Sequence, residues 1–244
     1  MLKSIKDVLR RTGVTALVRD AQKSAKAMAG RPRDRRLLKS YLESSTSKKL
    51  HLGAGKHVLG GWLNVDLDPL PGVIFLNVRD PFPLPDETFD HVFSEHLIEH
   101  IPYPDAGNML SECFRVLKPG GRLRVATPEM AFMTDLLLKS DEQPYRDYVK
   151  WSMDAFVRRR PGFDDVRKNE AVFVVNNFFR DWGHQFIYDE AALSDALSKS
   201  GFAAIERCEL GQSRDPALRN LENVTRMPEG FLRLETFVLE AQKP

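Results

Sequence analysis

Cysteine is scarce in this sequence, with only two among 244 residues. Two cysteines cannot build the disulfide framework of a small secreted domain, so we expect Cys113 and Cys208 to be buried free thiols in a reducing cytosol. Long apolar runs are also missing: no stretch approaches the length of a membrane span, and the first residues lack an apolar core of the secretory kind. These absences predict a cytoplasmic protein.

Excess positive charge is confined to the first fifty residues. Residues 1–50 contain seven Lys, seven Arg and four acidic residues, a charge of +10, which leaves −8 for the remainder. Apolar residues recur at helical spacing between Leu2 and Val18, which predicts a basic helical extension over residues 1–47. Such a helix can pack on the main domain, or its residues 1–30 can contact a membrane surface, an acidic partner or nucleic acid.

The main domain is expected to cover residues 48–244. Arg31-Pro32-Arg33 predicts a break in the preceding helix, and Ser44-Ser45-Thr46-Ser47 is typical of a linker. Apolar strand patterns then alternate with helical ones, as in a doubly wound α/β fold. Strands are expected near residues 50–52, 62–65, 72–76, 89–93, 122–126, 203–210 and 231–239, and helices over 105–117 and 189–201.

Residues 130–182 interrupt this alternation and are rich in large aromatic side chains. An insertion of this kind can be a lid that covers a substrate, or a helical extension with a small core of its own. The aromatic residues fit both interpretations.

A turn containing two glycines follows the first expected strand. Gly53 and Gly55 allow a ligand to lie against the backbone, and Asp66, at the end of the second strand, can accept hydrogen bonds from ribose hydroxyls. No third glycine follows, and Asp66 comes much sooner than the gap of about 20 residues found in dinucleotide sites. A nucleoside ligand without phosphates, such as S-adenosylmethionine, therefore fits better than a dinucleotide.

Four ordered segments resemble the class I S-adenosylmethionine-dependent methyltransferases, and more narrowly the small bacterial branch that accompanies surface-polysaccharide and sugar pathways. The segments are Leu50-His51-Leu52-Gly53-Ala54-Gly55, Gly61-Trp62-Leu63-Asn64-Val65-Asp66, Pro83-Leu84-Pro85-Asp86-Glu87-Thr88-Phe89-Asp90 and Arg115-Val116-Leu117-Lys118-Pro119-Gly120-Gly121. The resemblance covers about residues 48–240. It implies a Rossmann-like, mostly parallel sheet of seven strands with a reversed last strand.

The resemblance also implies which residues contact the cofactor. Gly53, Ala54 and Gly55 would pack against its methionine and ribose parts, and Asp66 would hold the ribose hydroxyls. The family often has an acid in the strand before the glycines, where this sequence has His51.

The remaining implied contacts come from later strands. Val78 and Arg79 would border the adenine through backbone groups, while Glu95 and His96 would face the methionine end. Asn77 stands where the family commonly has a carboxylate.

The segment His96-Leu97-Ile98-Glu99-His100 matches the H-x-x-E-H spacing of some zinc peptidases. It follows a strand inside a nucleoside-binding pattern, however, and no third metal ligand is recognisable in the sequence. We therefore expect this segment to flank the cofactor, and we expect no metal ion.

Two residues are candidates for the catalytic base. Methyl transfer needs an aligned nucleophile, and a hydroxyl nucleophile must also lose a proton. His184 lies between the insertion and a core helix, and an imidazole suits that proton transfer. Glu129, after the fifth strand, is the second candidate, as a base or as a ligand of substrate hydroxyls. His184 can instead only order its loop through hydrogen bonds.

These patterns predict a methyltransferase that uses S-adenosylmethionine and acts on a small-molecule or glycan acceptor, at oxygen. The acidic main domain disfavours a nucleic-acid substrate, since phosphate binding needs a basic surface. An RNA- or protein-modifying methyltransferase is the alternative. A non-catalytic scaffold with this fold, recruited to a membrane or partner by its first helix, is a third hypothesis.

Overall fold

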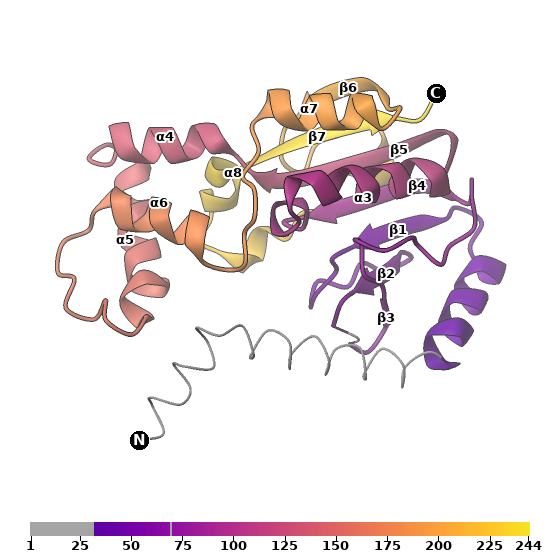
Figure 1. The fold of residues 1–244 in the computed structure, drawn as a ribbon, viewed down its shortest axis with the longest axis horizontal. Coiled ribbons are helices and arrows are strands. Elements are labelled where there is room, and N and C mark those ends of the chain that lie inside the picture. Colours follow the sequence, from indigo (N-terminus) through magenta and orange to yellow (C-terminus); the bar gives the residue numbers. More distant parts are fainter. Residues whose placement is uncertain (1–31, 69) are drawn as a thin grey trace. The chain divides into compact units, whose positions relative to one another are not determined.

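The computed structural model describes residues 32–68 and 70–244 (Figure 1). The described residues up to Asn77 form one compact unit, and Val78–Pro244 form the other. Residues 1–31 lie outside the described residues. They include the helical pattern predicted between Leu2 and Val18 and the membrane or partner contact proposed for residues 1–30. Within residues 32–68 and 70–244, none of the helices combines the length and apolarity that a membrane span needs.

The first unit contains a helix over residues 32–44 and three short parallel strands. Its strands are β1 (Lys49–Leu52), β2 (Leu63–Asp66) and β3 (Val73–Phe75), with β2 pairing both neighbours. Residues 45–48 join this helix to β1; of the predicted linker over residues 44–47, Ser44 is still helical. The described part of the helix begins at Pro32, so the predicted break at Arg31-Pro32-Arg33 stays a prediction.

Polar contacts tie this helix to the strands. The carboxylate of Asp34 accepts the Phe75 N–H at 3.1 Å, and the Arg33 guanidinium donates to the Val73 carbonyl at 2.6 Å. At the other end of the helix, the Tyr41 hydroxyl accepts the Lys49 N–H at 2.7 Å. Three contacts distributed along the helix thus hold it against β1 and β3. Whether the main domain begins near residue 48 stays a prediction.

The connection from β1 to β2, residues 53–62, contains turns and no helix. Parallel strands usually need a crossover of a dozen or more residues. The Asn64 side chain closes this shorter one: its Oδ1 accepts the Leu59 N–H at 2.9 Å, and its Nδ2 donates to the Leu59 and Trp62 carbonyls at 2.9 and 3.0 Å. One amide therefore satisfies three backbone groups that a helix would otherwise pair.

The second unit contains four strands: β4 (Phe89–Glu95), β5 (Leu117–Pro128), β6 (Ala203–Cys208) and β7 (Thr236–Gln242). β4 is parallel to β5, whereas β7 lies between β5 and β6 and is antiparallel to both. Together with the strands of the first unit, they make the seven-stranded, mostly parallel sheet with a reversed last strand that the sequence predicts. The predicted fold class is confirmed.

Two long helices cover one face of these four strands. α3 (Tyr103–Val116) and α7 (Glu190–Lys199) pack on each other and on the sheet (Figure 1). Asp189 caps α7 by accepting the Ala192 N–H at 2.7 Å, as its position predicts. On the inner side of α3, Cys113 is a buried free thiol, and Cys208 in β6 is free and half-buried.

The insertion consists of α4 (Met130–Leu138), α5 (Tyr145–Ala155), the short helix η2 (Val157–Arg159) and α6 (Ala171–Arg180). These helices gather beside the end of β5 (Figure 1). They enclose an apolar cluster whose members are Phe132, Met133, Leu136, Tyr148, Val149, Met153, Val157, Ala171, Val174, Val175 and Phe178. The insertion is thus a helical extension with its own core. Its role as a lid stays a prediction.

The predicted strand over residues 231–239 is wrong in its first half, because Phe231–Glu235 form the short helix α8 and β7 begins at Thr236. In a helix, neighbouring residues can pack against two different apolar clusters, here that of the insertion and a smaller one beside the sheet. Phe231 and Leu234 pack against the insertion, while Leu232 packs with the sheet residues beneath it. A strand would direct Leu232 and Leu234 to the same side. Three further short helices are η1 (Ile98–His100), η3 (Pro216–Leu218) and η4 (Val224–Arg226).

Candidate cofactor and acceptor site

In the first unit, Asp66 and the glycine turn form a polar cradle. The Asp66 carboxylate accepts the Gly55 N–H at 2.9 Å through one oxygen and the Asp68 N–H at 2.8 Å through the other. Each carboxylate oxygen retains a second lone pair for an external hydroxyl. Buried Ala54 holds the turn against β2 by donating its N–H to the Val65 carbonyl at 3.0 Å.

The glycines leave open space beside this carboxylate. Gly53 and Gly55 have positive φ angles of 67° and 50°, which favour glycine over residues with a Cβ. A Cβ built on Gly55 meets no heavy atom within 4 Å. A ligand can therefore approach the backbone at Gly55 closely. An oriented carboxylate next to accessible backbone fits the nucleoside part of the predicted cofactor.

His51 supports this loop rather than replacing an acid. Its Nδ1 lies 3.0 Å from Asn64 Oδ1, which also accepts the Leu59 N–H, so Nδ1 carries the proton and donates. Burial lowers the pKa of His51 to about 4; the hydrogen bond to Asn64 opposes this shift and His57 adds to it. The imidazole is therefore neutral near pH 7 and cannot supply the negative charge of an acid.

Val78 and Arg79, the predicted adenine neighbours, lie in a turn beyond β3 and belong to the second unit. Val78 is buried. The Arg79 guanidinium binds the Asp105 carboxylate at the start of α3, with Nε and Nη2 at 2.9 and 2.6 Å from Oδ2. The predicted adenine contact involves only the backbone of this turn, so the ion pair of the Arg79 side chain does not test it, and the contact stays a prediction.

Glu95 ends β4, and His96 follows it with a positive φ of 47°. Both oxygens of Glu95 accept the Asn223 N–H at 3.1 Å. His96 Nε2 lies 2.8 Å from Thr236 Oγ1, and its Nδ1 lies 3.2 Å from Arg226 Nη2 and 3.3 Å from Glu99 Oε1. Both side chains thus contact residues between Asn223 and Thr236, and their contact with the methionine end stays a prediction.

Glu99 lies at the centre of a polar cluster in the second unit, and its side chain is fully buried. Its Oε2 accepts the Thr127 hydroxyl at 3.0 Å, whereas its Oε1 accepts no hydrogen bond and lies 3.3 Å from His96 Nδ1. Burial alone would raise the pKa of Glu99, but the neighbouring His96 and His100 outweigh it and lower the pKa. The buried carboxylate is therefore ionised.

The backbone of Glu99 draws His184 towards this cluster. The N–H groups of Gln185 and Phe186 donate to the Glu99 carbonyl at 2.7 and 3.2 Å. The His184 ring meets the His100 ring edge to face, with centroids 4.8 Å apart. The fold thus brings His184, which follows the insertion in sequence, next to Glu99 and His100 of the H-x-x-E-H motif. The sequence alone did not reveal this contact.

His184 itself is held in one tautomer. Its Nδ1 lies 2.8 Å from the Phe178 carbonyl, which only accepts, so Nδ1 carries the proton and Nε2 carries a lone pair. Burial lowers the pKa of His184, and the charge of His100 adds to this shift although Glu99 opposes it. His184 is therefore neutral near pH 7. Its Nε2 can accept a proton, as a general base requires.

Glu129, the second candidate base, is held in an ion pair. Its two oxygens accept Nη1 and Nη2 of Arg207 at 2.7 and 2.8 Å. Arg207 also binds Glu190 at 3.0 Å, and the hydrogen bonds that Arg207 donates to Glu129 raise the pKa of the guanidinium. A carboxylate engaged through both oxygens is a weaker base than a free one, so this geometry favours His184.

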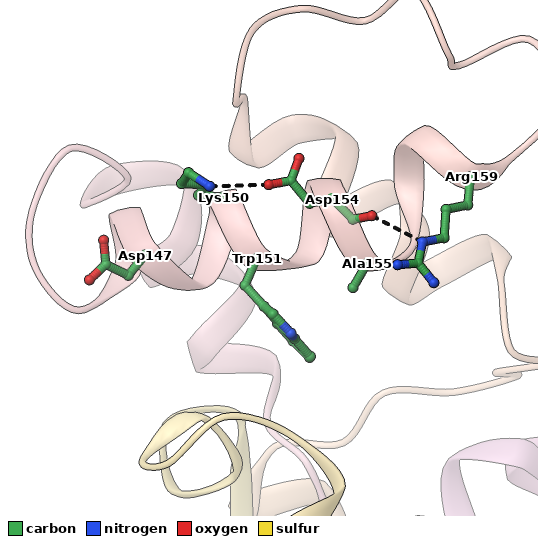
Figure 2. Close-up of a pocket in the computed structure, with 6 residues that line it drawn as sticks. All are labelled: Asp147, Lys150, Trp151, Asp154, Ala155 and Arg159. Atoms are coloured by element: carbon green, nitrogen blue, oxygen red, sulfur yellow. Dashed lines mark hydrogen bonds and ion pairs between the residues drawn. The ribbon is translucent and has the colours of Figure 1, made fainter.

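A separate hollow of about 400 Å³ is lined by residues of α5 and η2 (Figure 2). Two of its basic side chains are bound to Asp154: Lys150 lies 3.2 Å from the Asp154 carboxylate, and Arg159 donates to the Asp154 carbonyl at 3.2 Å. None of the predicted cofactor or catalytic residues lines it. The hollow is not part of the predicted site.

Part of this chain, from Asp66 to β5, is similar to known methyltransferases. Residues 66–125 match the family model described as a methyltransferase domain, a match that begins at Asp66 and ends in β5. A Mycolicibacterium smegmatis protein named a probable S-adenosylmethionine-dependent methyltransferase is 50% identical over 46 residues. That alignment spans 19% of this chain and 17% of the relative. Both findings support the predicted class I methyltransferase and its cofactor.

Solved structures with a similar fold have low sequence identity to this chain. A methyltransferase dependent on S-adenosylmethionine from Archaeoglobus fulgidus has a TM-score of 0.49 and 16% identity, covering 89% of this chain and 94% of its own. One from Mesorhizobium loti has a TM-score of 0.46 and 18% identity, covering 88% and 97%. At these scores, neither likeness carries an argument about function.

Proposed function

We propose that this chain is an S-adenosylmethionine-dependent methyltransferase that methylates a small-molecule or glycan acceptor at oxygen. The observation that carries the proposal is the Asp66 carboxylate, oriented by the Gly55 N–H at 2.9 Å beside open backbone. Asp66 is also the first residue of the segment that matches the methyltransferase domain. S-adenosylmethionine, when bound, supplies an electrophilic methyl group on a sulfonium centre.

The two units have different tasks in this proposal. In the first unit, Asp66 accepts hydrogen bonds from the ribose hydroxyls, and Gly53 and Gly55 let the ligand approach the backbone. In the second unit, His184 Nε2 takes the proton that an acceptor hydroxyl loses as its oxygen attacks the methyl carbon. A general base of this kind contributes about 10²–10⁴-fold to the rate.

The acceptor class follows from charge and from the site residues. Residues 51–244 carry a net charge of −8, which opposes binding of a polyphosphate backbone. A neutral, hydroxyl-rich acceptor such as a sugar suffers no such repulsion, and its hydroxyl needs a base. These features, together with the resemblance to the branch found in polysaccharide pathways, favour a glycan or small hydroxylated molecule over RNA.

Calorimetric titration of S-adenosylmethionine and of its demethylated product into the full chain tests the cofactor site. We expect micromolar binding, about −8 kcal/mol, for the wild type. Asp66→Ala should abolish measurable binding because it removes the oriented carboxylate. Asp68→Ala is the matched control: it removes a neighbouring carboxylate but keeps the N–H that Asp68 donates to Asp66.

Absence of binding by a well-folded wild-type protein would refute the methyltransferase proposal and leave the scaffold hypothesis. Equal cofactor affinity in wild type and Asp66→Ala would show that the cofactor does not bind at Asp66. If binding follows the expected pattern, transfer of a labelled methyl group to panels of sugars, small molecules, RNA and protein then identifies the acceptor.

A further inference from the structure

Three side chains of the second unit offer donor atoms to one point. They are Glu99 and His100 of η1 and His184 from the loop after α6, and their donor atoms lie within 4.8 Å of one another. Two imidazoles and one carboxylate form a donor set that proteins use for zinc and related transition metals. Of the H-x-x-E-H motif, Glu99 and His100 belong to this set, whereas His96 contacts Thr236 and Arg226 and lies behind Glu99, with Nδ1 3.3 Å from Oε1.

One oxygen of the buried Glu99 carboxylate accepts no hydrogen bond. The side chain has no exposed surface, and Oε1 is without a hydrogen bond although His96 Nδ1 lies 3.3 Å away. His100 Nε2 lies 4.0 Å from this oxygen, too far for a hydrogen bond. A buried acceptor that lacks a hydrogen bond costs free energy. A cation placed between Glu99 and the imidazoles of His100 and His184 would bind this oxygen directly.

Groups behind the donors orient them as they do in metal sites. His184 donates Nδ1–H to the Phe178 carbonyl, which leaves Nε2 as the ligand atom, and Thr127 holds the other oxygen of Glu99 at 3.0 Å. Such outer contacts set the tautomer and the orientation of metal ligands. The hydrogen bonds of Gln185 and Phe186 to the Glu99 carbonyl fix the loop of His184 relative to η1.

We propose that Glu99, His100 and His184 bind one divalent transition-metal ion of the zinc type. With metal–ligand bonds of about 2.0–2.2 Å, the ligand atoms of a tetrahedral ion lie roughly 3.4 Å apart, so separations of up to 4.8 Å contract by up to about 1.4 Å on binding. The His100 side chain, 34% exposed, has the freedom to make that movement. Three protein ligands leave a fourth position open, as in catalytic rather than structural zinc sites.

This proposal stands apart from the proposed methyl transfer, since metal binding needs neither cofactor nor acceptor. It does bear on the role of His184, because Nε2 can accept a proton or a metal ion but not both. In the metal-loaded protein, an acceptor hydroxyl at the open position would lose its proton with the help of the ion rather than of the imidazole.

Metal binding is tested on the full purified chain after chelator treatment and dialysis. Zn²⁺ titration with metal analysis should give one equivalent per chain, and Co²⁺ should give the visible absorption of a four- or five-coordinate ion. His100→Ala and Glu99→Gln should each weaken Zn²⁺ binding at least tenfold, as should His184→Ala. Thr127→Val, which removes an outer contact, should cost about 10–100-fold.

His57→Ala is the matched control, because His57 lies in the first unit and outside this cluster. Unchanged Zn²⁺ affinity in this control and a loss in His100→Ala would support the site. His100 is partly exposed, so its variant should fold even if a change at buried Glu99 is not tolerated. Absence of stoichiometric binding by the wild type, or equal binding by wild type and His100→Ala, would overturn the proposal. Neither result depends on methyltransferase activity.

Discussion

The two units of this chain hold their polar groups by different means. In the first unit, neutral groups hold the crossover between β1 and β2: one amide, Asn64, closes it, and neutral His51 supports it. In the second unit, charged groups are buried against one another, as Arg124 is between Glu222 and Glu240. The first arrangement shapes a loop for a ligand, and the second joins distant segments of the chain.

This difference has consequences for how each unit responds to change. A buried ion pair gives little net stability compared with an apolar pair, but removing one partner leaves a charge without compensation. A neutral hydrogen-bonded network carries a smaller penalty for the same kind of loss. We therefore expect stability to be most sensitive to charge-removing substitutions in the second unit, and ligand affinity to be most sensitive in the first.

The largest effect is expected from Arg124→Met. Arg124 and both its carboxylate partners are fully buried, with Nε 2.6 Å from Glu222 and Nη1 2.5 Å from Glu240. Removing the guanidinium leaves the buried Glu222 carboxylate without its cation, and leaves Glu240 with only Arg122, whose Nη1 lies 3.6 Å from Oε2. We expect a loss of about 3–5 kcal/mol in the free energy of unfolding, measured by denaturant titration.

Arg233→Met provides the comparison for that substitution, since Arg233 pairs with Glu209 at 3.5 Å where both side chains are well exposed. It should leave stability nearly unchanged. If Arg124→Met lowered the free energy of unfolding as little as Arg233→Met, buried ion pairs would not be what makes the second unit sensitive to substitution.

The next effect concerns turnover and separates the proposed roles of the units. His184→Ala should lower the rate constant of methyl transfer by about a hundredfold or more, the loss expected for a missing general base. Cofactor affinity should stay nearly unchanged, because in this proposal Asp66 and the backbone at Gly55, and not His184, hold the nucleoside part. Single-turnover kinetics and calorimetry measure the two quantities separately. Unchanged turnover would remove His184 from the mechanism.

The smallest effect is a pH dependence that originates in the first unit. Burial lowers the pKa of His51 from 6.5 to about 4 in the folded chain, so at acidic pH the unfolded chain binds a proton that the folded chain does not. Stability from this residue is complete above pH 6.5 and is lost as pH falls towards 4. Between pH 7 and pH 5 the loss should be about 2 kcal/mol.

Comparison of unfolding free energies for wild type and His51→Gln at both pH values isolates this contribution. Gln keeps a hydrogen-bond donor for Asn64 but does not titrate. The wild type should lose more stability than the variant on acidification. Identical pH profiles would mean that His51 does not stay neutral in the fold.

Much of the fold could be predicted because its patterns are local. The alternation of strands and helices and the glycine turn before Asp66 both depend on residues close together in the chain. The error at Phe231–Glu235 has the opposite origin. An apolar run of that length suits a strand or a helix, and only its packing between the insertion and the sheet selects the helix.

In the candidate site, too, contacts between residues close in sequence could be predicted, whereas contacts between distant segments could not. The Asp66 cradle could be anticipated because Gly55 and Asp66 are near neighbours in sequence and their contact is a single hydrogen bond. The partners of Glu95, His96 and Glu129 could not, since Asn223, Thr236 and Arg207 come from segments far along the chain. No periodicity or motif marks such pairs before the strands are assembled.

By itself, the sequence determined the fold class, the position of the glycine turn and the carboxylate beside it, because short-range sterics and the hydrophobic pattern decide these features. The tertiary structure alone decided that His184 meets Glu99 and His100, that Arg207 holds Glu129, and that the insertion has its own core. Such contacts depend on the order of strands in the sheet, and side chains that meet across it are selected by geometry rather than by their neighbours in the chain.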